Sequence, residues 1–301
     1  MRAPETMMDG SGAPAFLTTK EMATLLRVKE RRVYDLAAAG EVPCSRVTGK
    51  LLFPRHAVET WLAASLDGPG PRLARPMVML GSHDPLLEWA LQQSGAAIPS
   101  FFDGSEDGLA RFAAREGAAT ALHILDPETD SWNLHAVSAM GRGDGAVLIS
   151  FCRRRRGLML RRDEKRRPRN LGEMADWPFV RRQPGSGAEF LLRHLAAKAE
   201  LDAQALPAAL VARSEAEAAL AIAEGRAHAA LGLEALAKRH GLIFVPLLEE
   251  PLDLLIDRQA YFEPGMQRFL SFCRGFSFAK EAGRLPGYKA NAVGQVRWNS
   301  P

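Results

Sequence analysis

The stretch LTTKEMATLLRVKERRVYDLAAAGEVPCSRVTGKLLFPRHAVETWL, residues 17–62, decides the fold of the N-terminal part of the chain. Thr18 and Glu21 have the spacing of a capping box, in which each side chain bonds the other residue's backbone N–H at a helix start. A second helix is predicted from about residue 30 to residue 39, and Gly40 is suited to end it. Two short helices joined by a tight turn predict a helix-turn-helix, whose second helix enters the major groove of DNA.

The residues after these helices predict a β-hairpin and then a third helix. Short strands are expected at 45–48 and 51–53, with the turn Gly49-Lys50 between them. A helix from residue 54 would then carry Trp61 into the core. The hairpin would form a basic wing beside the second helix.

Basic side chains are concentrated in this segment, because residues 16–65 hold eight Lys or Arg against five Asp or Glu. Several lie on the first turns of the second helix or at the wing, where side chains reach phosphates and base edges. A solvated helical face would also explain an isolated Arg-Arg pair, and the tyrosine could equally be packed. The wing and the capping box favour DNA binding. The candidate DNA-binding residues are Lys29, Arg31, Arg32, Tyr34, Arg46 and Lys50.

The whole segment 17–62 resembles the excisionase/MerR-like winged-helix family. The shared features, in order, are a leading Leu-Thr, a Glu-x-Ala helix, an Arg-Val-Tyr recognition helix, Gly-x-Val-Pro, a basic wing and a closing Trp-Leu. Residues 29–31, Lys-Glu-Arg, depart from the family, which more usually has a small polar cap residue there. The resemblance implies double-stranded DNA as a partner, read by a homodimer at two half-sites about one helical turn apart.

The composition of the 301-residue chain is that of a globular protein with more than one domain, 47% hydrophobic and 25% charged. A disordered leader is expected at 1–14, the DNA-binding domain at 15–65, a Pro- and Gly-rich linker at 66–76 and a larger domain at 77–301. The leader lacks the layout of a secretory signal, and no apolar run is long enough to span a bilayer. These features predict a cytoplasmic protein without membrane contact. The three cysteines are far apart, which predicts reduced thiols and no metal site.

Short apolar runs alternate with amphipathic stretches from residue 77 onward, which predicts an α/β domain with a parallel sheet. Three of the expected helix starts are rich in Gly and Ser, at 81–85, 103–108 and 182–187. Free backbone N–H groups at a helix start, together with hydroxyls, can bind an anion. Each start alone is more often a plain cap, but three in one domain indicate a ligand. Strands are expected at 77–80, 119–124, 146–151, 158–160, 228–231 and 242–247, and helices at 85–93, 109–114 and 188–199.

Residues 76–298 resemble the periplasmic-binding-protein-like domain of bacterial helix-turn-helix regulators. That family is related to the type II solute-binding fold, which includes molybdate- and tungstate-binding proteins. The resemblance implies two α/β lobes, lobe 1 at about 77–150 and 252–301 and lobe 2 at about 151–251, with hinges near 151–156 and 247–251. It is carried by GSHDPLLEWAL, SFFDGSEDGLARFAAREGAATALHILDPETDSWN, RQPGSGAEFLL, ALGLEALAKRHGLIFVPL and GYKANAVGQVRW.

This resemblance implies a ligand-responsive regulator that senses a small oxyanion in its cleft, with molybdate or tungstate first and no other cofactor. The two histidines among the implied residues could equally be capping or buried groups. Asp103 and Glu234 would repel an anion and would become contacts only for a cationic or polyol ligand. The implied ligand-binding residues are Ser82, His83, Gly104, Ser105, His123, Arg182, Gln183, Ser186, Gly187 and Gly232.

Two arginine-rich stretches stand out, the run 153–156 and residues 161–170, where relatives usually have a small Gly-Asn-Pro-type turn. Such charge runs are normally solvated surface. Otherwise they would add DNA contacts or place a more strongly anionic ligand near the cleft.

The chain is predicted not to be an enzyme. Ser82, His83 and Asp84 are adjacent in sequence, whereas a catalytic triad converges from separate loops. Three alternatives stay open: an excisionase-like architectural protein whose C-terminal domain only dimerises, a regulator that senses an organic molecule, and an enzyme or binding module whose winged domain holds a partner protein.

Overall fold

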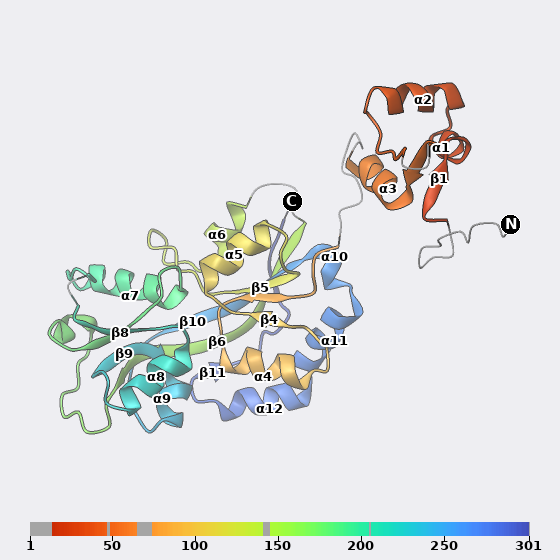
Figure 1. The fold of residues 1–301 in the computed structure, drawn as a ribbon. Helices are drawn as coiled ribbons and strands as arrows, with labels where there is room; N and C mark the ends of the chain where they lie inside the picture. The colour runs from red at the N-terminus through yellow and green to blue at the C-terminus, as the bar shows by residue number, and fades with distance from the viewer. Residues whose placement is uncertain (1–13, 47–48, 65–73, 141–144, 205, 301) are drawn as a thin grey trace. The chain divides into compact units, whose positions relative to one another are not determined.

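The computed structural model describes residues 14–46, 49–64, 74–140, 145–204 and 206–300. The chain divides into a small N-terminal unit, up to residue 73, and a large unit from residue 74 (Figure 1). Most of the expected leader and linker lies outside the described residues. Among the helices that are described, none is long and apolar enough to cross a bilayer.

The small unit packs short helices and a two-stranded sheet around one core. The capping box is present, since the Glu21 N–H donates to Thr18 Oγ1 at 3.3 Å and the Thr18 N–H donates to Glu21 Oε2 at 2.7 Å. The second helix has no side-chain cap at Lys29, where the sequence departs from its family. The elements are β1 (Phe16–Thr18), α1 (Thr19–Leu26), α2 (Glu30–Ala38), β2 (Leu52–Pro54) and α3 (Arg55–Ala64).

The expected hairpin pairing is present at Ser45 and Leu52, whose backbones exchange two hydrogen bonds of 2.7 and 2.9 Å, and the second wing strand also pairs with β1, which the sequence did not indicate. β2 pairs antiparallel with β1, with Leu17 opposite Phe53, and Ser45 forms an isolated bridge to Leu52. Residues 47–48 of the expected first wing strand lie outside the described residues. Pairing with β1 buries both Leu17 and Phe53 in the core, and burial of large apolar side chains is the dominant favourable contribution.

A mixed sheet organises the large unit, in place of the expected parallel one. Its order is β4-β3-β5-β10-β6-β9-β7-β8, with β11 and β12 also paired to β6. The strands at each end are parallel to one another, whereas β6 and β10 run antiparallel to each other and to their outer neighbours. The strands are β3 (Met79–Gly81), β4 (Ser100–Phe101), β5 (Ala119–Leu122), β6 (Ala146–Leu160), β7 (Phe179–Arg182), β8 (Ala208–Ala212), β9 (Ala229–Leu233), β10 (Ile243–Asp257), β11 (Tyr288–Lys289) and β12 (Val296–Asn299).

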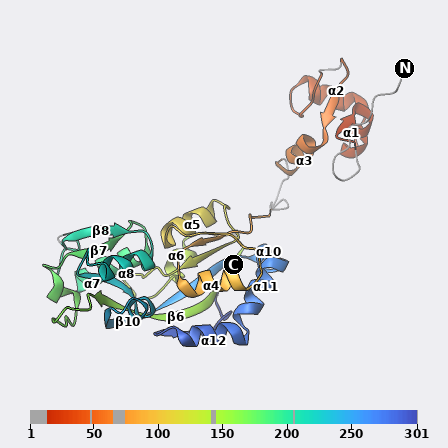
Figure 2. The same cartoon turned by 60° about the horizontal axis from the view of Figure 1, so that its bottom comes forward.

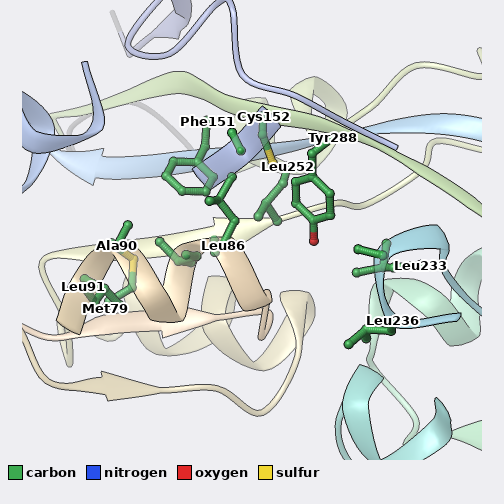
Figure 3. Close-up of a cluster of buried hydrophobic side chains, with 14 of the residues drawn as sticks. Met79, Leu86, Ala90, Leu91, Phe151, Cys152, Leu233, Leu236, Leu252 and Tyr288 are labelled. Carbon is green, nitrogen blue, oxygen red and sulfur yellow. The ribbon is translucent and has the colours of Figure 1, made fainter. Parts of the chain in front are cut away.

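Helices cover both faces of this sheet (Figure 1). At the end of the sheet that holds β3 and β5, one face is covered by α5 and α6 and the other by α4, α11 and α12. At the end that holds β7 and β9, one face is covered by α7 and the other by α8 and α9. The largest buried cluster includes Met79, Leu86, Phe151 and Leu252 (Figure 3). The helices are α4 (Pro85–Gln93), α5 (Ser105–Ala113), α6 (Leu134–Ser138), the 3₁₀ turn η1 (Leu171–Met174), α7 (Gly187–Lys198), α8 (Glu215–Ala223), α9 (Glu234–Arg239), α10 (Arg258–Tyr261), α11 (Pro264–Cys273) and α12 (Phe276–Arg284).

The two longest strands, β6 and β10, have 15 residues each and connect the two halves of the large unit. Figure 2 shows them continuing from one half to the other. The strands expected at 146–151 and 158–160 are therefore one strand, with the arginine run 153–156 in its middle. Register shifts in β10 fall between Pro246 and Leu248 and between Leu252 and Asp253, on either side of the segment expected to be a hinge.

The arginine run is not the solvated surface that its charge suggested. Successive side chains of a strand point to opposite faces. Arg154 and Arg156 are accordingly fully buried, whereas Arg153 is exposed and Arg155 is partly exposed. Two of the four guanidiniums must therefore find partners inside the domain.

Candidate ligand cleft and DNA-binding surface

Loops from both halves of the large unit meet around one small cavity. It lies beside the loops after β3, β5 and β7 and the starts of α5 and α7. Its volume is about 10 Å³, so the cleft is closed in this structure, with room for about one water molecule. Phe102, Ala188, Arg213 and Glu215 also line it. Seven of the ten expected ligand-binding residues line it, namely Ser82, His83, Gly104, His123, Arg182, Gln183 and Ser186.

Ser82 lines one side of this cavity and is bonded to a second buried serine, Ser105. Ser82 Oγ and Ser105 Oγ are 2.7 Å apart, and the His123 N–H donates to Ser105 Oγ at 3.1 Å. The pair shares one hydrogen bond, so one of its two O–H groups stays available as a donor. Ser105 begins α5, which approaches β3 closely because Gly81 and Gly108 meet there; a Cβ on Gly108 would lie 2.3 Å from Gly81 Cα.

The start of α7 forms the opposite side. Ser186 caps this helix, since its Oγ accepts from the Glu189 N–H at 3.2 Å. Gly187 touches His123, and a Cβ on Gly187 would lie 2.5 Å from the His123 carbonyl oxygen. The Glu106 N–H also donates to the Gly185 oxygen at 3.2 Å, directly across the cleft. The N-termini of α5 and α7 thus face the same small space, where the Glu106 and Glu189 N–H groups already have partners and the others of the first turns have none within their helix.

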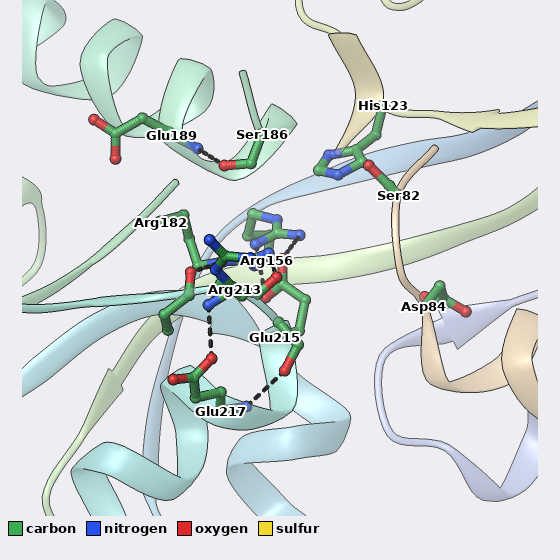
Figure 4. A network of polar contacts seen from close by, with 12 residues as sticks. Ser82, Asp84, His123, Arg156, Arg182, Ser186, Glu189, Arg213, Glu215 and Glu217 are labelled. Atoms are coloured by element: carbon green, nitrogen blue, oxygen red, sulfur yellow. Dashed lines mark hydrogen bonds and ion pairs between the residues drawn. The ribbon is translucent and has the colours of Figure 1, made fainter. Parts of the chain in front are cut away.

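A chain of buried charges lies beside the cavity (Figure 4). Carboxylates and guanidiniums alternate along it, and each pair of neighbours is separated by 2.7–3.0 Å. Because three acids balance three bases, this group of six buried side chains carries no formal net charge. In order, its members are Asp84, Arg154, Glu250, Arg156, Glu215 and Arg182.

The pKa values of Glu250 and Glu215 keep these two buried carboxylates ionised. Burial alone would raise the pKa of Glu250, but Arg156 and a second guanidinium outweigh it and hold that pKa well below its ordinary value. Burial likewise opposes Arg156 and Arg182 at Glu215, whose pKa is lowered to about 2. Burial lowers the pKa of His123, although Glu250 Oε2 lies 3.4 Å from its Nδ1. At neutral pH Glu250 and Glu215 are therefore charged and His123 is neutral.

Arg182, the cation expected to bind the ligand, already has partners. Its Nε donates to the Ala212 oxygen at 3.0 Å, its Nη2 donates to the Arg213 oxygen at 3.1 Å, and its Nη1 lies 2.8 Å from Glu215. The exposed Arg213 also lines the cavity, and it forms no salt bridge with another described residue. Sequence reasoning missed Arg213 and Glu215. The available signal was a further serine-capped helix start, because Ser214 caps α8.

Gly232, like Ser105 and Gly187, does not line the cavity. It lies in β9 opposite Gly157 of β6, and a Cβ on it would meet Met159 Cε at 2.2 Å. Its small size is therefore needed for packing inside the domain. Glu234, considered for a cationic ligand, instead pairs with Arg155 at 2.8 Å.

The small unit exposes the side chains expected to contact DNA. Lys29, Arg31 and Arg32 are exposed at the start of α2, and they form no salt bridge with any described residue. Arg46 lies near the other end of the helix, where its Nη2 donates to the Ala37 oxygen at 3.1 Å. A surface hollow of about 510 Å³ is lined by Tyr34, Arg46 and Lys50 together with Lys20.

Comparison with known proteins finds a family model for each of the two units. A family model described as the PBP superfamily domain matches residues 88–274, more than half of the chain, and a helix-turn-helix domain model matches residues 16–65. The uncharacterized protein YvgK of Bacillus subtilis (strain 168) is 24% identical over 302 residues, which cover 93% of this chain and 96% of that protein.

Two solved structures resemble the large unit. A phosphate ABC transporter substrate-binding protein with bound phosphate from Clostridium perfringens has a TM-score of 0.53 at 9% identity, covering 71% of this chain and 98% of that one. The regulatory domain of CcmR from Synechocystis PCC6803, in complex with 2-PG, has a TM-score of 0.44 at 14% identity, covering 65% and 93%. The expected fold class, a helix-turn-helix region followed by a two-lobed periplasmic-binding-protein-like α/β domain, is confirmed.

Proposed function

Because the chain belongs to the PBP superfamily and carries a helix-turn-helix domain, we propose that it is a ligand-responsive transcriptional regulator. In this proposal α2 is the recognition helix, and the large unit binds the effector in its closed cavity. We place the protein in the cytoplasm as a homodimer, so that two copies of α2 reach two half-sites of double-stranded DNA.

For the effector we propose a small oxyanion, with molybdate or tungstate as the first candidates. One observation carries this choice: two helix N-termini face the same cavity, Ser82 and Ser186 line it, and the Ser105 hydroxyl bonds Ser82 from behind. Backbone N–H groups and hydroxyls are neutral donors that can surround a tetrahedral anion. The neighbouring charge chain is balanced, so Arg213 at the rim supplies the additional positive charge.

Binding requires the cleft to open, because about 10 Å³ holds no oxyanion. The hydrogen bond from Glu106 to Gly185 and the contact between Gly187 and His123 would separate as the halves move apart. A ligand that bridges both helix starts would then favour a closed form, which is a shift in the population of two pre-existing states. In a dimer this closure would alter the spacing of the two recognition helices.

The proposal is tested by thermal unfolding of the full chain with molybdate, tungstate, sulfate, phosphate and a panel of organic acids. A ligand at 100 times its Kd adds about 2.7 kcal/mol, which raises Tm by about 5–10 °C for a unit of this size. The double variant Ser82→Ala/Ser105→Ala should bind about tenfold more weakly. The matched control is Ser94→Ala, which removes a buried hydroxyl that bonds the Leu91 oxygen at the end of α4.

The possible results separate the parts of the proposal. A shift by one oxyanion that is reduced in the double variant, and not in the control, supports this site. A shift that is equal in all three proteins moves the site elsewhere, and no shift with any oxyanion removes the oxyanion assignment. DNA binding, measured by fluorescence anisotropy, tests regulation separately: affinity that never responds to an effector favours the architectural alternative.

A further inference from the structure

A second hollow, apart from the cavity described above, lies between α4, α9 and α12. Its volume is about 550 Å³, within the range of roughly 300–1,000 Å³ that is typical of small-molecule sites. The floor is apolar: it includes Leu86 and Trp89 of α4, Leu236 of α9, and Leu285 after α12. Figure 3 shows Leu86 and Leu236 on facing elements of the domain.

The apolar floor includes an aromatic ring held in a fixed position. Trp89 packs against Phe272 of α11, with ring centroids 5.5 Å apart, and stays partly exposed. The loop after α12 approaches the start of α9 closely at Gly287, where a Cβ would lie 2.8 Å from Glu234 Oε2. The hollow therefore combines a preformed aromatic surface with fixed walls on two sides, which limits the ordering cost of binding.

The rim of this hollow has an excess of positive charge. Lys238 and Arg239, in the last turn of α9, are exposed and form no salt bridge with any described residue. On the opposite wall Arg284 pairs with Glu281 at 3.3 Å, so that these two charges cancel. Two cations thus stand unpaired beside an apolar floor.

We propose that this hollow is a second small-molecule site, which takes an organic anion with an aromatic or alicyclic body and one carboxylate or sulfonate. The body would cover Trp89 and Leu285, which stay partly exposed, and the anionic group would pair with Lys238 and Arg239. A bare oxyanion would leave the apolar floor uncovered, and a neutral hydrocarbon would not use the cations. This site is separate from the cavity proposed to bind the effector. Helix α9 packs on β9 and β10, whereas α4 packs on α11 and α12, so a ligand in the hollow would contact both groups of elements.

Isothermal titration of the full chain tests this, with naphthalene-1-sulfonate as the probe and 1-naphthalenemethanol as its neutral analogue. We expect the sulfonate to bind at least tenfold more tightly than the alcohol. Lys238→Ala/Arg239→Ala should weaken the sulfonate about tenfold and leave the alcohol unchanged, and Trp89→Ala should weaken both. The matched control is Arg226→Ala, an exposed arginine outside the hollow.

The cleft variant Ser82→Ala/Ser105→Ala separates this proposal from the first, because sulfonate binding should persist in it. Circular dichroism verifies that each variant is folded. The proposal is overturned by equal affinity for the two probes, by sulfonate binding that survives Lys238→Ala/Arg239→Ala, by its loss in the cleft variant, or by no sulfonate binding at about 1 mM.

Discussion

Replacing Glu250 with Gln removes the central carboxylate of the buried charge chain. Its Oε1 lies 2.7 Å from Arg154 Nε and 2.8 Å from Arg156 Nη2, and all three side chains are fully buried. Gln has nearly the same shape, so the packing is kept while two guanidiniums lose their shared counter-charge. Removing one partner of a buried pair typically costs about 3–5 kcal/mol, and we expect a loss of that size in the free energy of unfolding.

Urea unfolding, followed by tryptophan fluorescence, measures this loss. The large unit holds Trp89, Trp132, Trp177 and Trp298, so its transition dominates the signal. With a urea m-value of about 3 kcal/mol/M, the midpoint should fall by about 1–1.7 M. The loss should be the same from pH 8 to pH 5, because a carboxylate with a lowered pKa contributes fully above its ordinary value of 4.5 and loses its contribution only below it.

Glu249→Gln is the matched control, because this neighbour is one-third exposed and pairs with Lys289 and Arg153 at the surface. Exposed pairs contribute at most about 1 kcal/mol, so its midpoint should hardly move. Equal effects of the two substitutions would refute the reasoning, since burial of the charge would then have no energetic consequence.

Three further predictions concern other parts of the molecule. Burial raises the pKa of Asp253 to about 6, so its contribution to stability is present below its ordinary pKa and is lost as pH rises through 6. Asp253→Asn should therefore gain about 2 kcal/mol over wild type between pH 4 and pH 6.5 in urea titrations, and a constant difference would contradict this. Gly187→Ala puts a Cβ 2.5 Å from the His123 backbone oxygen across the cleft, which should force the two halves apart. The radius of gyration from small-angle scattering should then increase, and effector binding should weaken at least tenfold. The control Gly283→Ala, which has open space around it, should match wild type in both measurements. Arg31→Ala/Arg32→Ala should lower affinity for any duplex DNA and reduce the slope of log K against log salt by about 1–2, measured by anisotropy; an unchanged slope would mean that neither side chain meets a phosphate.

Local signals in the sequence predicted local structure. The capping box of Thr18 and Glu21, the end of α2 before Gly40, and the helix at 85–93 depend on residues within a few positions of one another. Such features are formed by the same short segment that encodes them, and therefore they can be read without knowing the fold.

Distant pairing could not be read in this way. The partners of the buried arginines lie far away in the chain, with Asp84 70 positions from Arg154 and Glu215 59 positions from Arg156. An arginine run without visible counter-charges was therefore interpreted as surface. Positions 153–156 are all arginine, so the alternation of buried and exposed side chains that the strand imposes leaves no trace in the sequence. The role of Gly232 likewise depended on Met159, which belongs to another strand.

The place of β10 in the sheet also affects how the chain is made. β5 has β10 as its antiparallel neighbour, with Leu122 opposite Asp253, so its edge stays open until roughly 130 further residues have left the ribosome. At about 5–20 residues per second this takes on the order of 10 s. During that interval a nascent edge of wholly buried strand residues stays open to pairing with other chains, until the last sixth of the chain emerges.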